Sequence, residues 1–120
     1  MEKDPNGVSA HDLGAKLDNG KPMMSLLAYF GQALIEVSKV GTIGAKKYTR
    51  GGWQFVDDGF NRYTDAMLRH YFAEYYEDID DDTKMFHCAQ TCWNSLARLE
   101  LMLREKNNIN ISKEDFENGK

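Results

Sequence analysis

Residues 60–94, FNRYTDAMLRHYFAEYYEDIDDDTKMFHCAQTCWN, combine two helical patterns with an acidic turn between them. Asp65, Leu68 and Phe72 follow the i, i+3, i+7 spacing and share one helical face. His87, Gln90 and Asn94 repeat that spacing after the turn. Polar side chains therefore fall where a helical pair needs a core. Two antiparallel helices joined at the acidic turn would place residues near 70 opposite residues near 90.

The length and composition of the chain indicate one globular domain. It has 120 residues, of which 42% are hydrophobic and 28% are charged. The formal net charge of −4 argues against duplex nucleic acid as the main partner. No apolar run approaches the roughly 20 residues of a membrane span. Since the first residues also lack a signal-peptide pattern, we expect a cytoplasmic protein with no membrane partner.

The patterns predict an all-α fold, an antiparallel bundle of three long helices. The helices are expected over residues 25–47, residues 60–76 and a stretch from 82 or 83 to 106. Residues 1–24 are predicted to be an extended N-terminal segment, residues 25–106 the helical domain, and residues 107–120 a polar tail. Three helices bury little, and the chain is rich in aromatic residues. We therefore expect a homo-oligomer, at least a dimer.

Glycines interrupt the first predicted helix at Gly31, Gly41 and Gly44. Each weakens a helix by up to about 1 kcal/mol relative to alanine. Close approach of another helix or of a ligand is one explanation. A break in the helix near Gly41 is the other.

Basic and aromatic residues flank this helix on both sides. Lys16 and Lys21 lie in a turn sequence before it, and Lys46 and Lys47 lie in its last turn. They have a simple structural explanation, because charged turns face water and cations favour a helix C-terminus. A functional explanation is a phosphate clamp, with the ring of Tyr48 or Trp53 against a base.

Aligning the predicted helices gives one polar seam, made of Glu36, Lys47, Asp65, His70, His87 and Asn94. Unpaired buried charges cost several kcal/mol each, so such groups must pair or hold a cation. Each group also has a structural alternative, such as an Asp65–Arg69 ion pair or a structural histidine. Carboxylates favour Mg²⁺ or Mn²⁺, and a histidine ligand shifts the preference toward Mn²⁺ or a later metal.

Several motifs in fixed order carry a family resemblance. LDNGKPMMSLL is followed by IEV, GAKKY, a Trp, RYTDAMLRH, the Glu-Asp turn and H-x6-N. Over about residues 16–103 this order resembles the phage dATP/dGTP diphosphohydrolase N-terminal domain family, which is similar to the all-α MazG-type pyrophosphohydrolases. The chain departs from the family pattern at Gly52, where an Asn is common, and at Gln90, where a second His is common. The paired acids of MazG-type enzymes are also absent as such.

The resemblance implies metal-dependent hydrolysis of a deoxynucleoside triphosphate, a purine one, to the monophosphate and pyrophosphate. Mg²⁺ or Mn²⁺ is the implied cofactor. We predict Glu36, Asp65 and His70 as catalytic residues, and Glu36, Asp65 and Asp78 as metal ligands. The residues predicted to bind substrate are Lys16, Lys21, Lys46, Lys47, Tyr48, Trp53, Arg69, His87 and Asn94.

Two other interpretations remain open at the level of sequence. The departures from the family pattern also fit a catalytically silent phage protein that binds or sequesters a nucleotide or a nucleotide signal. A purely structural helical oligomer is the third interpretation. If the chain is phage-encoded, its compartment is the host cytoplasm.

Overall fold

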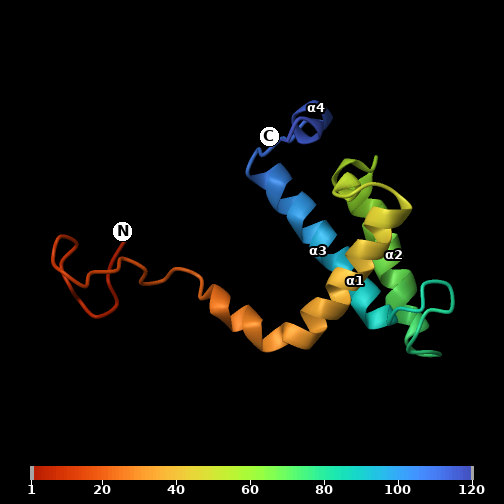
Figure 1. Ribbon diagram of the computed structural model, residues 1–120, viewed down its shortest axis with the longest axis horizontal. Helices are drawn as coiled ribbons and strands as arrows, with labels where there is room; N and C mark the ends of the chain where they lie inside the picture. The colour runs from red at the N-terminus through yellow and green to blue at the C-terminus, as the bar shows by residue number, and fades with distance from the viewer. Residues whose placement is uncertain (1, 120) are drawn as a thin grey trace. The chain divides into compact units, whose positions relative to one another are not determined.

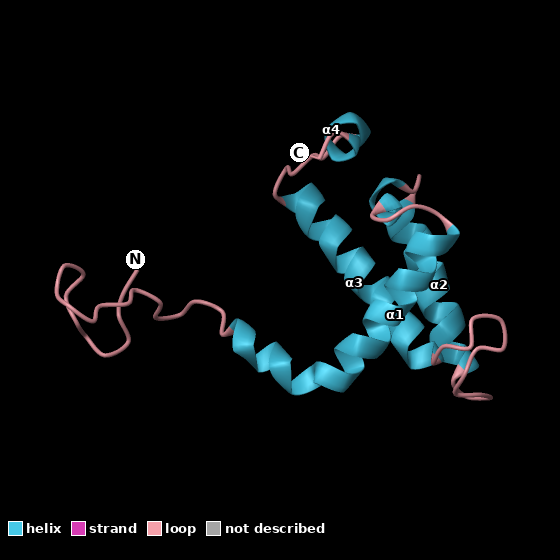
Figure 2. Cartoon of the chain, viewed as in Figure 1, coloured by secondary structure: helices cyan, strands magenta, loops and turns pink. Residues whose placement is uncertain are grey.

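The fold is described by a computed structural model that covers residues 2–119 (Figure 1). Helices make up its regular structure (Figure 2). This confirms the predicted all-α class. An isolated antiparallel bridge also joins Ile79 and Phe86. In the described range, no helix is both long and apolar enough to cross a bilayer. The elements are η1 (Met24–Phe30), α1 (Gly31–Lys47), η2 (Gly52–Phe55), α2 (Gly59–Ala73), α3 (His87–Lys106) and α4 (Lys113–Glu117).

The chain divides into two compact units, residues 1–31 and 32–120. In the N-terminal unit, the carboxylate of Asp4 accepts hydrogen bonds from the backbone amides of Asn6 and Lys16, at 2.7 and 2.6 Å. The amide of Asn19 also donates to the carbonyl of Lys3 at 2.7 Å. These bonds fold residues 3–19 back on themselves. The domain boundaries expected at residues 24 and 106 stay predictions.

The second unit is organised around the antiparallel pair α2 and α3, which lie side by side in Figure 1. Arg98 of α3 donates from Nε to the hydroxyl of Thr64 at 2.6 Å, and its guanidinium lies 4.9 Å from the ring centroid of Phe60. Gly59, at the start of α2, is buried near Leu101. These contacts set the register in which residues near 70 face the first turns of α3, as the sequence predicted.

α1 meets this pair where Gly41 lies against the indole of Trp93. A Cβ atom added to Gly41 would fall 2.5 Å from one ring carbon of Trp93 and 2.7 Å from another. The close approach of a second helix is therefore the reason for a glycine here, and α1 continues unbroken through this position. A Cβ atom added to Gly44 would meet open space, so packing does not explain the glycine at that position.

An aromatic cluster fixes the loop between α1 and α2. The ring of Trp53 makes edge contacts with Tyr63 and Trp93, each at a centroid distance of 6.3 Å. The Tyr63 hydroxyl donates to the carbonyl of Trp53 at 2.6 Å. α4 adds Phe116 to this region, where it packs against Phe55 at 5.3 Å.

The helix bounds differ from the expected ones at three points. The first seven residues of the first helix are a 3-10 helix whose side chains are all exposed, so no packing enforces α geometry there. α2 ends at Ala73, three residues early. α3 begins at His87 because Lys84 adopts a left-handed conformation, with φ of 61°, that breaks the helix before it.

Substituting Gly41 with alanine is expected to lower the free energy of unfolding by about 1–3 kcal/mol, because the rigid indole of Trp93 must move. Gly44→Ala is the matched control on the same helix. It is expected to raise stability by up to about 1 kcal/mol, since it adds helix propensity without a clash. Urea denaturation at equal protein concentration measures both, and a Gly41→Ala variant as stable as Gly44→Ala would contradict the packing described.

Candidate functional site

The turn between α2 and α3 is a tight reversal that brings Asp80 back to the start of α3. The Asp80 amide donates to the carbonyl of Met85 at 2.9 Å, and the Lys84 amide donates to the carbonyl of Asp80 at 2.8 Å. The His87 amide then donates to the carbonyl of Asp78 at 2.9 Å. Left-handed Lys84 turns the chain. The acidic run is therefore an ordered turn in which Asp80 is only partly exposed.

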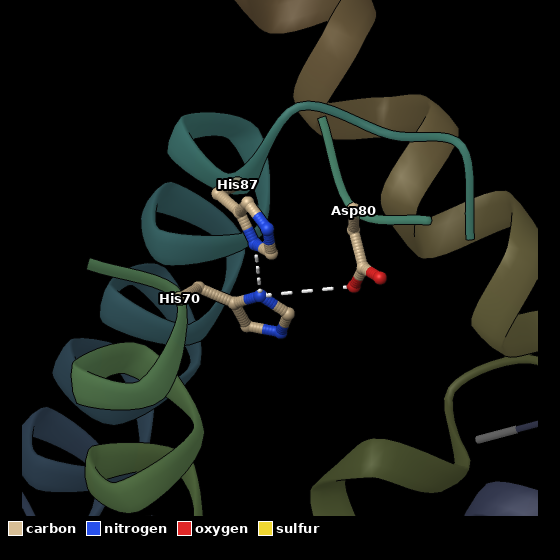
Figure 3. A group of neighbouring side chains, drawn as sticks. All are labelled: His70, Asp80 and His87. Carbon is tan, nitrogen blue, oxygen red and sulfur yellow. Dashed lines mark hydrogen bonds and ion pairs between the residues drawn. The ribbon is translucent and has the colours of Figure 1, made fainter. Parts of the chain in front are cut away.

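Three side chains from α2, the turn and α3 converge here, as Figure 3 shows. The Nδ1 atoms of His70 and His87 lie 2.9 Å apart. Oδ2 of Asp80 lies 3.9 Å from Nδ1 of His70. We call this group the His–Asp–His cluster. His87 is 5% exposed, while the other two side chains are partly exposed, so the cluster is open on one side.

Neighbouring groups hold the cluster residues in place. Nε2 of His87 pairs with Oε1 of Glu77 at 3.2 Å. The side-chain amide of Gln90 donates to Oδ2 of Asp80 at 3.2 Å, and the Asp82 amide donates to Oδ1 at 2.9 Å. With a proton on Nε2 toward Glu77, a neutral His87 presents the lone pair of Nδ1 to the cluster.

The pKa shifts of His70 and Asp80 both favour the deprotonated side chain. Burial lowers the pKa of His70 below its ordinary value, and the nearby His87 lowers it further against the opposing effect of Asp80. Burial acts to raise the pKa of Asp80, but hydrogen bonds from the Asp82 amide and Gln90, with both histidines nearby, lower it overall. A neutral imidazole and an ionised carboxylate are the forms that bind metal ions.

The predicted metal ligands lie elsewhere in the structure. Within residues 2–119, His70, Asp80 and His87 are the group of three or more His, Cys, Asp or Glu side chains close enough to share an ion. Glu36 pairs instead with Lys39 at 2.8 Å, one turn along α1. Asp65 and Asp78 are exposed. The structure thus brings His70 into a candidate metal cluster but does not join it with Glu36, Asp65 or Asp78, whose roles stay predictions.

A large groove lies between α1, the η2 loop, α2 and α3, with a volume of about 1520 Å³. Cations and aromatic rings are among its lining residues, and none of the lining residues is Asp or Glu. We call it the basic groove. Its cationic residues are Lys46, Arg50, Arg62 and Arg69, and its Tyr and Trp residues are Tyr48, Trp53, Tyr63 and Trp93.

Three of the four groove cations are free of internal partners. Across residues 2–119, the side chains of Lys46, Arg50 and Arg69 make no hydrogen bond or ion pair, whereas Arg62 donates to the carbonyl of Asp57 at 3.4 Å. Unpaired cations in a groove that has no Asp or Glu in its lining favour a positive local potential, although the net charge of the chain is −4. Such a groove suits a polyanion.

The predicted substrate-binding residues are distributed over three places. The basic groove contains Lys46, Tyr48, Trp53, Arg69 and Asn94. His87 belongs to the His–Asp–His cluster, and Lys47 lies over the ring of Tyr48 at 5.2 Å. Lys16 and Lys21 lie in the N-terminal unit, where Lys21 pairs with Glu2 at 3.3 Å, and their roles stay predictions.

Sequence reasoning missed Asp80, Arg50 and Arg62 as site residues. Asp80 is one of several acids in the turn, and the sequence of the turn does not show which acid faces the two histidines. The backbone hydrogen bonds of the reversal make that choice. Arg50 had a usable signal, because it precedes Gly51-Gly52 directly after the basic segment that was selected.

The basic groove and the His–Asp–His cluster are both built partly from residues of α2 and α3. Arg69 lines the groove and directly precedes His70. Asn94 lines the groove two helical turns after His87, about 10 Å along α3. The fold and these sites define an all-α protein in which the basic groove lies beside a candidate metal cluster.

Comparison with known proteins supplies the family. The profile described as "dATP/dGTP diphosphohydrolase, N-terminal" matches residues 11–110, and the chain belongs to this family. A Salmonella phage PMBT28 protein named dATP/dGTP diphosphohydrolase is 38% identical over 77 residues, which are 63% of this chain and 25% of that protein. The chain therefore matches about a quarter of that relative's length. No solved structure matches the chain.

Proposed function

We propose that the protein hydrolyses a purine deoxynucleoside triphosphate, with a divalent cation, to the monophosphate and pyrophosphate. The basic groove carries this proposal, because a triphosphate is the small polyanion that unpaired cations and exposed rings would bind together. Membership of the family and the printed name of the phage relative support the purine substrate.

The groove residues divide into two roles under this proposal. Lys46, Arg50 and Arg69 bind the phosphate oxygens and neutralise charge that develops on the leaving pyrophosphate. Tyr48, whose ring is 75% exposed, stacks on the base, and the partly buried Trp53 forms the wall behind it. Asn94 already donates to the Gln90 carbonyl at 2.8 Å, which leaves its amide oxygen to orient the sugar.

Hydrolysis at the α-phosphorus needs a water oxygen to attack phosphorus while the bond to the bridging oxygen breaks. A bound Mg²⁺ or Mn²⁺ would lower the pKa of a water molecule and screen the phosphates. The His–Asp–His cluster holds donors suited to Mn²⁺, and Asp78 precedes Asp80 in the same turn. Asp65 lies one turn before Arg69 on the same face of α2, and we assign it the proton of the attacking water. Glu36 keeps the role predicted from the sequence, that of a catalytic and metal-binding carboxylate.

The proposal is tested by incubating the purified chain with each dNTP and NTP plus Mg²⁺ or Mn²⁺, then separating the products by ion-exchange chromatography. Monophosphate and pyrophosphate from dATP or dGTP are the expected products. Intact nucleotide that stays bound would contradict hydrolysis and support the sequestering protein instead. Intact nucleotide that does not bind would contradict both, leaving the structural oligomer.

Removing a groove cation is expected to weaken substrate binding. Arg69→Ala should raise KM about 10- to 100-fold, since a charged hydrogen bond contributes about 1.5–3 kcal/mol. Lys106→Ala is the matched control, because Lys106 is exposed at the end of α3 and does not line the groove. Steady-state kinetics on both variants measure the difference, and equal KM values would remove Arg69 from the substrate site.

Asp65→Asn is expected to abolish turnover while leaving the fold intact. Asp65 is exposed and, in the described part of the chain, makes no ion pair, so the change should alter stability by less than about 0.5 kcal/mol. Product release in the chromatographic assay and thermal melting follow the two effects. Retained turnover would show that Asp65 does not take the proton.

Self-association is the second part of the proposal. The buried hydrophobic side chains are Val37, Met85, Ala89 and Ala97, and no large side chain among residues 2–119 is fully buried. A core this small does not stabilise a domain alone. Exposed apolar side chains continue along all three long helices, namely Leu34, Ile35, Leu68, Tyr71, Phe72, Leu96, Leu99, Met102 and Leu103. A second copy of the chain would cover them.

Sedimentation equilibrium is expected to give at least twice the chain mass of 13.8 kDa. Leu99→Glu, on an exposed part of α3, should shift the equilibrium toward the monomer. A stable, folded wild-type monomer at micromolar concentration would contradict self-association.

A further inference from the structure

We propose that His70, Asp80 and His87 bind one divalent transition-metal ion, of the Mn²⁺, Co²⁺ or Zn²⁺ type, in preference to Mg²⁺. The proposed ligand atoms are Nδ1 of both histidines, which lie 2.9 Å apart, and Oδ2 of Asp80, which lies 3.9 Å from Nδ1 of His70. This inference names the cation of the proposed hydrolase but does not depend on hydrolysis, because the centre is defined by its donors alone.

The spacing of the donors fits a shared ion. Ligand atoms at 2.0–2.1 Å from one metal lie about 2.9–3.4 Å apart at angles of 90–110°. The two Nδ1 atoms are 2.9 Å apart, and the Asp80 oxygen is 3.9 Å from the His70 nitrogen. All three atoms lie within 4.8 Å of one another. A small shift of the Asp80 carboxylate toward the two histidines would complete a three-sided site.

The second hydrogen bond of His87 prepares it as a ligand. Its Nε2 pairs with the Glu77 carboxylate, which fixes the proton on that nitrogen and directs the Nδ1 lone pair inward. A carboxylate behind a histidine is the usual arrangement around protein metal ions. A structural hydrogen bond from Nδ1 of His70 to Nδ1 of His87 would explain the 2.9 Å contact but leaves the Asp80 carboxylate beside the two rings unexplained.

The carboxylate of Asp80 is also held from behind. Gln90 donates to Oδ2 and the Asp82 amide donates to Oδ1, so both oxygens are oriented before any ion arrives. Oδ2 keeps a free lone pair toward the histidines, since an ionised carboxylate oxygen accepts about two hydrogen bonds. The ligand set is therefore preorganised, with its remaining coordination positions on the partly exposed side.

The types of donor atom determine which metal ion the site prefers. Mg²⁺ prefers oxygen ligands in octahedral geometry and is held by carboxylates, phosphates and water. Two imidazole nitrogens and one carboxylate favour Mn²⁺, Co²⁺ or Zn²⁺, with affinity rising along that series. The open positions would accept water or a phosphate oxygen.

The test uses the full chain, stripped of metal with a chelator, and titrated with Co²⁺ as a spectroscopic probe. One equivalent per chain is expected, with visible d–d absorption. Zn²⁺ should displace the Co²⁺, and millimolar Mg²⁺ should not. The same titration on a Cys88→Ser, Cys92→Ser variant controls for the two exposed thiols and is expected to give the same spectrum.

Nuclear magnetic resonance of the wild-type chain identifies the ligand atoms without a substitution. The chain has three histidines, so His11 in the N-terminal unit is an internal control. One equivalent of Zn²⁺ should shift the Nδ1 resonances of His70 and His87 and leave His11 unchanged. Shifts of His11 alone, or of none, would overturn the proposal.

Single substitutions measure how much each residue contributes to the affinity for Co²⁺. His70→Ala and Asp80→Asn should weaken Co²⁺ binding by at least about 100-fold, and Glu77→Ala by about 10- to 100-fold because it acts through His87. His11→Ala should bind Co²⁺ like the wild type. Unchanged affinity in His70→Ala would overturn the proposal, provided that circular dichroism shows the variant folded.

The outcomes separate this inference from the proposed function. A chain that binds Co²⁺ at these histidines without hydrolysing any nucleotide keeps the metal centre and loses the hydrolase. A chain that hydrolyses dNTPs with Mg²⁺ but binds no Co²⁺ keeps the hydrolase and overturns the metal centre.

Discussion

The hydrogen-bonded reversal between Asp78 and His87 is the constraint on which the second unit depends. It joins α2 to α3 in the register seen at Arg98 and Thr64, and it begins α3 at His87. Because few apolar side chains are buried in this unit, polar contacts determine an unusually large part of its fold. The same backbone bonds that close the turn place the Asp80 carboxylate beside the two histidines. Fold and candidate site are thus set by one local structure.

The distribution of charge connects the groove to its proposed ligand. The chain is acidic overall, yet the groove contains four cations and no acid, while acids gather in the turn beyond His70. A nucleotide triphosphate placed along the groove would have its base near Tyr48 and its phosphates near Arg69, one residue from the cluster. Under the proposal the two charged regions would act on one ligand, since the cations would bind its oxygens and the cluster would hold a metal ion. Loss of either region would leave the other with a partial function.

Much of this architecture could be predicted from sequence because it depends on local patterns. Apolar periodicity predicted the three long helices, and close approach of another helix was one of the two explanations left open for Gly41, where Trp93 is found. Lys46, Tyr48, Trp53, Arg69 and Asn94 were selected by residue type and do line one groove. The choice of Asp80 among neighbouring acids was out of reach, because it depends on backbone hydrogen bonds in an irregular turn. The expected polar seam was too broad, since Glu36 finds Lys39 within its own helix.

A crystal structure of the chain with Mn²⁺ and a dATP or dGTP analogue that cannot be cleaved between its α- and β-phosphates tests the central claim most directly. We expect the phosphates on Lys46, Arg50 and Arg69, the base on Tyr48, and the ion on His70, Asp80 and His87. A nucleotide bound outside the basic groove, or an ion held by Glu36, Asp65 and Asp78 without the histidines, would contradict it.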